Sequence, residues 1–174
     1  MLTFFEYQTE RLSISKLGLD DAKHILALNL DPDWQQYIGD RGVYDAESAR
    51  EYIINGPIRM YRDQGFGVLA VREKLSGEFI GTCGLLQREK LREPDIGFAF
   101  LPKGRGKGYA LEACQVLLQS VEQSRQWSYI NALVTPQNDA SVKLLIKLGF
   151  SREGNLPGFD PDKETDLYRL TFTI

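Results

Sequence analysis

The sequence predicts an α/β domain, more closely α+β, in which helices cover both faces of a mixed, mostly antiparallel central sheet. Three observations predict this class. Residues 66–102 contain three short runs of β-favouring residues divided by turn residues, and the rest of the chain then alternates strand, helix, strand and helix. Apolar residues in the first third have mainly helical spacing. Because no linker, repeat or low-complexity tract divides the 174 residues, we expect a single domain over residues 1–174.

The first third is expected to be one strand followed by helices. Residues 9–15 alternate apolar and polar side chains, as a half-buried strand does. Residues 22–30 have helical spacing, and the Asp-Pro pair that follows is expected to end this helix. Asp45 is a suitable N-cap for a helix over residues 46–54, which the Gly-Pro pair at 56–57 is expected to interrupt before a helical pattern resumes.

The remaining chain supplies most of the sheet. A hairpin is expected from residues 66–73 and 79–87, followed by a strand that ends at Pro102, since proline cannot donate to a ladder. A four-turn helix over residues 108–124 precedes an apolar strand of the buried, parallel type at 129–134. The last predicted elements are a helix from the N-cap Asn138 to the C-cap Gly149 and strands over residues 150–154 and 165–174.

Composition excludes several classes of function. With 21 basic and 24 acidic residues the net charge is -3, which argues against a general nucleic-acid surface. No run of about 18 apolar residues is present, so we expect no membrane segment and a cytoplasmic protein. Cys83 and Cys114 form no metal-binding pattern and are expected to be buried, reduced thiols, so no metal is predicted. His24, the only histidine, is expected on a helix, which leaves Ser-His or Cys-His chemistry unsupported.

The segment KGRGKGYA, residues 103–110, places three alternating glycines between a strand and a strong helix. Such a junction exposes main-chain N–H groups at a helix N-terminus, where an anion can bind; the alternative is a flexible turn with solvated charges. A P-loop requires GxxxxGK followed by Ser or Thr, which is absent. A Rossmann fingerprint requires a third glycine where Leu111 stands, and it would occur earlier in the chain. The loop therefore predicts an anion site of another kind.

With this loop, the order of elements resembles the GNAT superfamily of acetyl-CoA-dependent N-acetyltransferases over nearly the whole chain. In that family a Q/R-x-x-G-x-G/A signature binds the pyrophosphate, and Lys103-x-x-Gly106-x-Gly108 matches it with a lysine in the first position. The substitution keeps the charge but loses the bidentate fork of arginine. Five ordered segments, TERL, IGTCGL, DIGF, KGYALEA and PQNDASVKLLIKLGF, resemble the branch that includes the ribosomal-protein-alanine N-acetyltransferases. That branch also acts on small amines and antibiotics.

The resemblance implies acetyl-CoA as cosubstrate, a primary amine of a small molecule or a protein N-terminus as acceptor, and a homodimer as one option. It also implies that main-chain groups hold the pantetheine arm and the pyrophosphate. The implied cofactor positions are Phe98, Phe100, Leu101, Lys103, Gly104, Arg105, Gly106, Lys107, Gly108, Tyr109, Ala110 and Asn138. The side chains among them fit an ordinary strand or core position equally well, because only main-chain atoms are needed.

The catalytic positions follow less directly. Many relatives carry a tyrosine acid where this chain has Leu145, and the branch resembled uses an NxxS serine, which corresponds to Ser141. Ser141 is therefore the expected partner of the CoA sulfur, with a local capping hydroxyl as the alternative. Asp95, with Glu93 as second choice, is the expected base, acting directly or through water. Glu112 is expected to have a structural role, and Tyr168 is expected to pack across the strands, with a position facing the acceptor site as the alternative.

Acceptor selection is expected from residues 31–61 and from the segment before the last strand. Their acidic residues would attract a cationic amine or are solvated loop charges, and they include Asp31, Asp33, Asp160, Asp162 and Glu164. Two alternatives to acetyl transfer stay open at this point. One is a longer acyl donor such as succinyl-CoA, and the other is a noncatalytic CoA-binding or sensing domain, suggested by Leu145.

Overall fold

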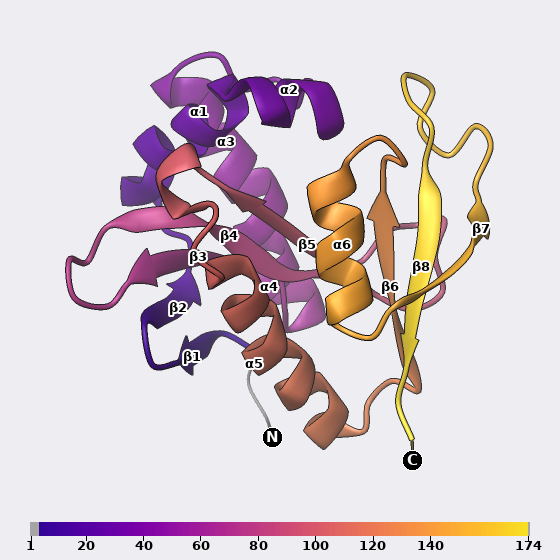
Figure 1. The fold of residues 1–174 in the computed structure, drawn as a ribbon. Helices are drawn as coiled ribbons and strands as arrows, with labels where there is room; N and C mark the ends of the chain where they lie inside the picture. The colour runs from indigo at the N-terminus through magenta and orange to yellow at the C-terminus, as the bar shows by residue number, and fades with distance from the viewer. Residues whose placement is uncertain (1–3, 174) are drawn as a thin grey trace.

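An eight-stranded sheet with the order β1-β2-β3-β4-β5-β6-β8-β7 forms the centre of the computed structural model, which describes residues 4–173 (Figure 1). All neighbouring strands pair antiparallel except β5 and β6, which pair parallel. This confirms the predicted mixed, mostly antiparallel sheet. The strands are β1 (Glu6–Gln8), β2 (Leu12–Lys16), β3 (Val68–Glu73), β4 (Phe79–Leu86), β5 (Asp95–Phe100), β6 (Tyr129–Val134), β7 (Ser151–Asn155) and β8 (Asp166–Thr171).

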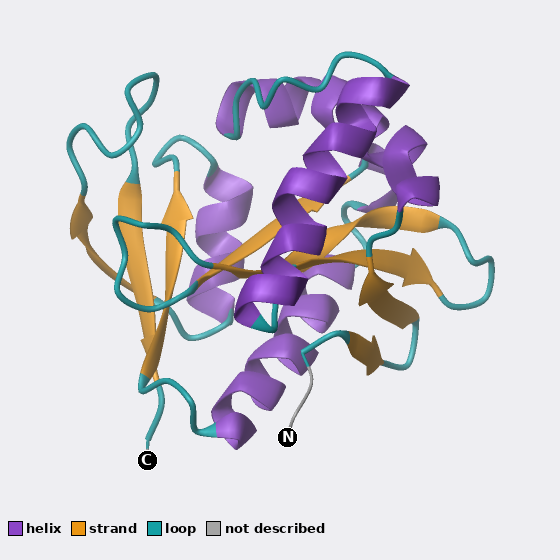
Figure 2. Ribbon diagram, turned by 180° about the vertical axis from the view of Figure 1, so that it is seen from behind, coloured by secondary structure: helices purple, strands orange, loops and turns teal. Residues whose placement is uncertain are grey.

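Helices cover both faces of this sheet (Figures 1 and 2). One group packs its apolar side chains with Ala70 and Phe79 of the sheet: α1 (Ala22–Leu30), α2 (Pro32–Tyr37) and α3 (Ala46–Ile53). On the other face, α5 (Tyr109–Ser124) and α6 (Asp139–Lys147) cover the larger core. Short 3-10 turns, η1 (Leu19–Asp21) and η3 (Pro102–Gly104), precede α1 and follow β5.

The first third contains more structure than its sequence pattern indicates. β1, which pairs with β2, and α2 were not expected. The Asp-Pro pair ends α1 but also starts α2, because Asp31 accepts the Asp33 N–H as N-cap and Pro32 occupies the first helical position. The Gly-Pro pair interrupts the α-helical winding, as expected, but the helical path continues. The pair lies in a π-turn, η2 (Ile54–Ile58), whose wider winding accommodates the missing N–H of Pro57 before α4 (Arg59–Gln64) continues.

Both cysteines and the histidine, for which no chemical role was expected, pack against other side chains. Cys83 and Cys114 are buried, free thiols with their Sγ atoms 3.6 Å apart. His24 lies on α1 and stacks on Phe79 with ring centroids 4.6 Å apart. Within residues 4–173, no helix combines the length and apolar character needed to cross a membrane.

β5 and β6 divide the sheet into two parts. The two strands pair only at Asp95 and Asn131 and then diverge, while β6 pairs along its whole length with β8 on its other edge. We call this divergence the β5–β6 split. α5 follows β5 and α6 follows β6, so both helices begin beyond the carboxyl ends of the parallel strands, where ligands of such sheets bind.

Candidate active site

The glycine loop, residues 104–108, leads into α5 and leaves a row of main-chain N–H groups free. Gly106 and Gly108 have left-handed φ angles of +70° and +79°. α5 starts directly after Gly108, and its first bond runs from the Glu112 N–H to the Gly108 carbonyl at 3.1 Å. In the described part of the chain, the N–H groups of residues 106–111 have no hydrogen-bond acceptor. Free amides at the positive end of a helix dipole form a phosphate site.

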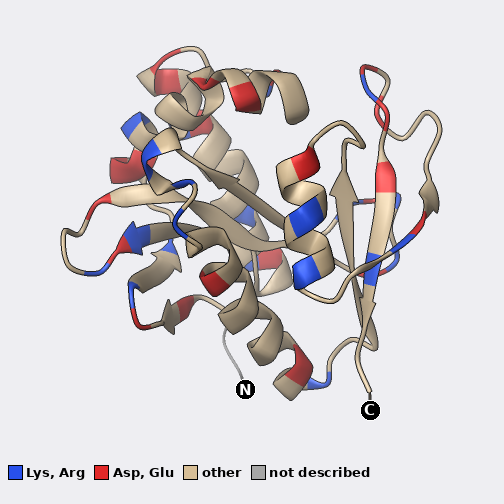
Figure 3. Ribbon diagram, viewed as in Figure 1, with Lys and Arg blue, Asp and Glu red and all other residues tan. Residues whose placement is uncertain are grey.

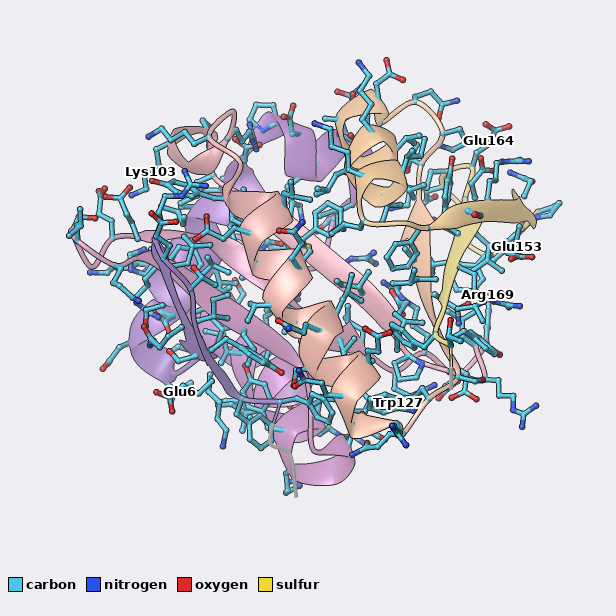
Figure 4. The ribbon with its side chains drawn as sticks, turned by 60° about the horizontal axis from the view of Figure 1, so that its bottom comes forward. Glu6, Lys103, Trp127, Glu153, Glu164 and Arg169 are labelled. Carbon is cyan, nitrogen blue, oxygen red and sulfur yellow. The ribbon has the colours of Figure 1, made fainter. Side chains whose placement is uncertain are left out.

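Lys103 does not point its ammonium into this loop. Its Nζ lies 3.1 Å from a carboxylate oxygen of Glu78, in the turn between β3 and β4. In Figure 4, Lys103 lies on the side of the molecule away from Glu164 and Arg169. The pattern Q/R-x-x-G-x-G/A also matches two residues later, as Arg105-x-x-Gly108-x-Ala110, where Gly108 is the N-cap of α5.

Arg105 fixes the loop in place. Its guanidinium contacts Asp31 at 2.7 Å and Asp33 at 3.0 Å, and its Nε donates to the Phe100 carbonyl at 3.0 Å. These contacts tie the loop to the start of α2. Gly104, another expected cofactor residue, also has a packing role, since a Cβ at this position would lie 2.9 Å from the Ile80 carbonyl oxygen.

Side chains on the far side of the loop hold its last residues. The Arg11 guanidinium donates to the Lys107 carbonyl at 2.8 Å and to the Glu112 carboxylate at 2.8 Å. Tyr109 donates its hydroxyl to Glu73 at 2.7 Å. Glu112 thus has the structural role expected of it, and Tyr109 can offer a ligand only its main chain. In the part of the chain that the structure describes, the ammonium of Lys107 has no carboxylate partner.

Main-chain groups of β5 face the β5–β6 split. The Leu101 N–H donates to the Ile80 carbonyl of the β4 side at 2.9 Å, so strand alternation directs the N–H of Phe98 to the opposite edge, toward the split. The Phe100 carbonyl on that edge accepts from Arg105. Of the three expected pantetheine contacts, Phe98 therefore has the free main chain, and the amide of Leu101 is engaged with β4.

Asp95 lies at the closed end of the split. Its side chain is 1% exposed and accepts from Arg88 Nε at 2.9 Å. Burial raises the pKa of Asp95 to about 6, against the opposing charge of Arg88. Asp95 alternates in phase with Ala99 and Leu101, which pack against the α1–α3 layer, so its carboxylate faces away from α5. The base expected from the sequence is a buried, partly neutralised carboxylate.

Ser141 lies near the open end of the split. It is in the first turn of α6, and its N–H donates to the side chain of the N-cap Asn138 at 3.2 Å. Asn131, opposite Asp95, is three strand steps of about 3.3 Å before the end of β6, so the structure does not bring Asp95 and Ser141 together. Leu145 and Tyr168 are core residues, the first 1% exposed and the second 6% exposed.

Residues 11–151 match the family model of an acetyltransferase (GNAT) domain. The chain belongs to the GNAT acetyltransferase family. It is 33% identical over 159 residues to the uncharacterized N-acetyltransferase p20 of Bacillus licheniformis, a match that covers 89% of this chain and 87% of that protein. As a family member it is an acetyl-CoA-dependent N-acetyltransferase.

Solved structures of GNAT proteins have the same fold. A GNAT acetyltransferase from Bacillus anthracis superposes with a TM-score of 0.80 at 24% identity, covering 96% of this chain and 98% of that one. RimL, a ribosomal alpha-N-protein acetyltransferase in complex with coenzyme A, superposes with a TM-score of 0.77 at 14% identity, covering 94% and 96% of the two chains. The free amides of the glycine loop and the unpaired edge of β5 fit coenzyme A, whose phosphates and amide-containing arm need such groups.

A cleft of about 370 Å³ opens on the Asp95 side of this GNAT domain. It lies between the end of α2 and the β7–β8 loop, residues 156–165, both of which are at the top of Figure 1. Lys163 holds the two walls together by donating to the Tyr37 and Ile38 carbonyls, each at 2.8 Å. Arg88, the partner of Asp95, also lines this cleft. We call it the side cleft.

The acidic residues expected to attract an amine lie in different environments. Asp31 and Asp33 pair with Arg105, and Glu164 accepts from the Gln137 side chain at 3.2 Å. Asp160 and Asp162 do line the side cleft, and Figure 3 shows charges of both signs on the β7–β8 loop. Arg88, Lys163 and the cleft itself were missed, because no local sequence pattern marks residues that meet only after folding.

Proposed function

We propose that the enzyme binds acetyl-CoA along the β5–β6 split and acetylates a primary amine that enters through the side cleft. The observation that carries this proposal is the position of Asp95, a buried carboxylate at the closed end of the split whose partner Arg88 lines the cleft. The Phe98 N–H faces the split, whereas the Asp95 carboxylate faces the α1–α3 layer. Donor and acceptor can therefore approach the same strand without competing for space.

Proton removal is assigned to Asp95. A carboxyl group with a pKa of about 6 is ionised at neutral pH. The carboxylate can then accept the proton that the bound ammonium loses when it becomes the neutral amine. Phe98 is three strand steps, about 10 Å, from Asp95, so the transfer passes through a chain of ordered waters. Arg88 is the positioning residue that holds the carboxylate.

Acetyl-CoA supplies the thioester carbon that the neutral amine attacks, forming the C–N bond as the C–S bond breaks. The Phe98 N–H is assigned to the carbonyl oxygen of the acetyl group, where negative charge develops. The Ser141 hydroxyl is assigned as hydrogen-bond donor to the departing sulfur. The separation of Asp95 from Ser141 suits this division of roles, because the base acts on the amine and the serine on the leaving group.

Two acceptor classes are compatible with the family. RimL is named as a ribosomal alpha-N-protein acetyltransferase, so a protein N-terminus is one acceptor class, and a small amine is the other. We also assign the enzyme to the cytoplasm, since two reduced thiols 3.6 Å apart suit a reducing compartment. A homodimer stays a prediction, which light scattering of the purified protein would test.

The proposal is tested with purified protein, acetyl-CoA and a panel of amines that contains polyamines, aminoglycosides, amino acids and peptides with free N-termini. We expect thiol release with at least one member and no turnover with N-blocked analogues. Replacing acetyl-CoA by succinyl-CoA in the same panel tests the longer-donor alternative. Saturable binding of acetyl-CoA without turnover of any amine would contradict the proposal and favour a sensing domain.

A further inference from the structure

Two arginines of the side cleft have N–H groups without partners. Arg88 uses its Nε on Asp95, and its two terminal nitrogens make no hydrogen bond within the described residues. Arg41, from the segment between α2 and α3, lines the same cleft and has neither an ion pair nor a side-chain hydrogen bond within residues 4–173. By contrast, Arg11, Arg72, Arg105 and Arg152 all pair with carboxylates. The side cleft therefore keeps unused cationic donors.

The charges of Arg41 and Arg88 act on two ionisable groups from different elements, Tyr52 and Lys163. Burial raises the pKa of Tyr52, on α3, and the charges of Arg41 and Arg88 oppose this rise. Burial lowers the pKa of Lys163, on the β7–β8 loop, Asp160 opposes this change, and Arg41 and Arg88 lower the pKa further. Tyr52 and Lys163, of which Lys163 lines the side cleft, thus respond to the same two guanidinium groups.

The carboxylates of the cleft are mostly engaged elsewhere. Asp40 accepts from the Tyr44 hydroxyl at 2.5 Å and from the Gly42 N–H at 2.8 Å. Asp160 accepts the N–H of the next acidic residue in its loop, Asp162, at 2.9 Å and lies 3.7 Å from Lys163. The side chain of Asp162 is exposed at the rim. Asp95 pairs with Arg88 and Asp160 with Lys163, so Arg41 supplies the guanidinium group of the cleft that has no carboxylate partner within residues 4–173.

We propose that Arg41 and Arg88 select a small acceptor that carries a carboxylate together with its amine, as an amino acid does. This inference rests on the proposed function, because it takes the side cleft as the acceptor entrance. Guanidinium groups bind carboxylates through paired N–H donors, and a volume of about 370 Å³ accommodates a molecule of amino-acid size. With its carboxylate on the arginines, the acceptor presents its amine toward Asp95, which Arg88 also contacts.

The test compares amino acids with the corresponding amino acid amides as acceptors at saturating acetyl-CoA. Each pair shares its amine and side chain and differs in the negative charge. The amides have the less basic amine, so simple reactivity would favour them. We expect the wild-type enzyme to prefer the acids by roughly tenfold or more in kcat/KM, the range in which a charge-assisted pair contributes to recognition.

The decisive variant is Arg41→Gln, because Arg41 contacts no residue assigned to catalysis. It is expected to raise KM for the acids and leave kcat/KM for the amides unchanged, so the preference disappears. Arg41→Lys keeps the positive charge and should therefore retain part of the preference for acids. Arg59→Gln is the matched control, since Arg59 is an exposed arginine on α4 that pairs with Asp63 outside the cleft.

Three results would overturn the assignment. One is an equal preference for acids and amides in the wild type, the second is an Arg41→Gln variant that lowers both series alike, and the third is turnover confined to polyamines or to peptides regardless of charge. In the third case acetyl transfer itself stands and only the selection by the arginines fails. If no amine of any class is acetylated while acetyl-CoA binds, the proposed function fails with it.

Discussion

The two halves of the site are built in different ways. The donor half consists of main-chain groups from one continuous stretch, residues 98–111, in which the glycines give access to the N–H groups. The acceptor half consists of side chains from α2, the end of β4 and the β7–β8 loop, which are far apart in sequence. A main-chain site constrains residue type locally and leaves a readable pattern. The residues of a side-chain site come together only in the folded protein, so they form no local sequence pattern.

Asp95 connects the two halves, and Asp95→Asn should have the largest effect. Loss of a general base is expected to lower kcat/KM by roughly 10²–10⁴-fold while acetyl-CoA binding is kept. Because burial raises the pKa of Asp95 to about 6, the wild-type kcat/KM should fall as the pH drops below about 6, where the carboxyl is protonated, and should level off above it. Steady-state kinetics across pH would check both, and an unchanged acidic limb in Asp95→Asn would exclude Asp95 as the base.

Gly106→Val tests whether the donor half depends on the main chain. The side chain strains a left-handed backbone and covers free amides, so we expect acetyl-CoA binding to weaken by roughly 100-fold, about 2.7 kcal/mol, in calorimetry. Gly77→Val is a matched control, since Gly77 has φ of +72° against +70° for Gly106 and neither has an atom within 4 Å of a built Cβ. Equal loss of binding in both variants would indicate that the substitutions destabilise the protein in general, and would not support a phosphate site at the glycine loop.

Lys163→Met tests the acceptor half alone. It removes the two hydrogen bonds to the Tyr37 and Ile38 carbonyls that hold the walls of the side cleft together. We expect KM for the acceptor to rise by about tenfold, about 1.4 kcal/mol, and KM for acetyl-CoA to stay unchanged. If KM for acetyl-CoA rises instead, the two halves are not separable in the way their construction suggests.

Ser141→Ala should have the smallest effect. The cap of α6 uses the main-chain N–H of Ser141, so removing the hydroxyl leaves that hydrogen bond in place. A kcat reduced by roughly tenfold or less with unchanged CoA affinity fits loss of one hydrogen bond to the leaving group. Asn138→Ala, which removes the cap, should instead lower the free energy of unfolding by about 1 kcal/mol. If the Ser141→Ala enzyme has the wild-type kcat, Ser141 has no chemical role.

Sequence patterns were sufficient for the elements that bury a regular face. The hairpin of β3 and β4 and the helices α1, α5 and α6 all occur where periodicity and caps predicted them. β1 and α2 were missed because three to six residues carry too little periodicity, and the π-turn at Pro57 because winding depends on packing. The contacts of individual loop side chains could not be predicted, because they depend on which residues come close together in the folded protein. Arg105 and Lys103 both precede glycines, yet Arg105 pairs with Asp31, the N-cap of α2, and Lys103 pairs with Glu78 in a distant turn.

The single pairing of Asp95 with Asn131 has a consequence for the handling of the protein. Beyond this pair, two strand edges in the middle of the sheet lack the ladder that would protect them, and open edges can recruit strands of other molecules. Coenzyme A bound along β5 would cover these edges and thereby reduce self-association. Preparations stripped of coenzyme A should therefore aggregate sooner on heating than preparations saturated with it, at equal protein concentration.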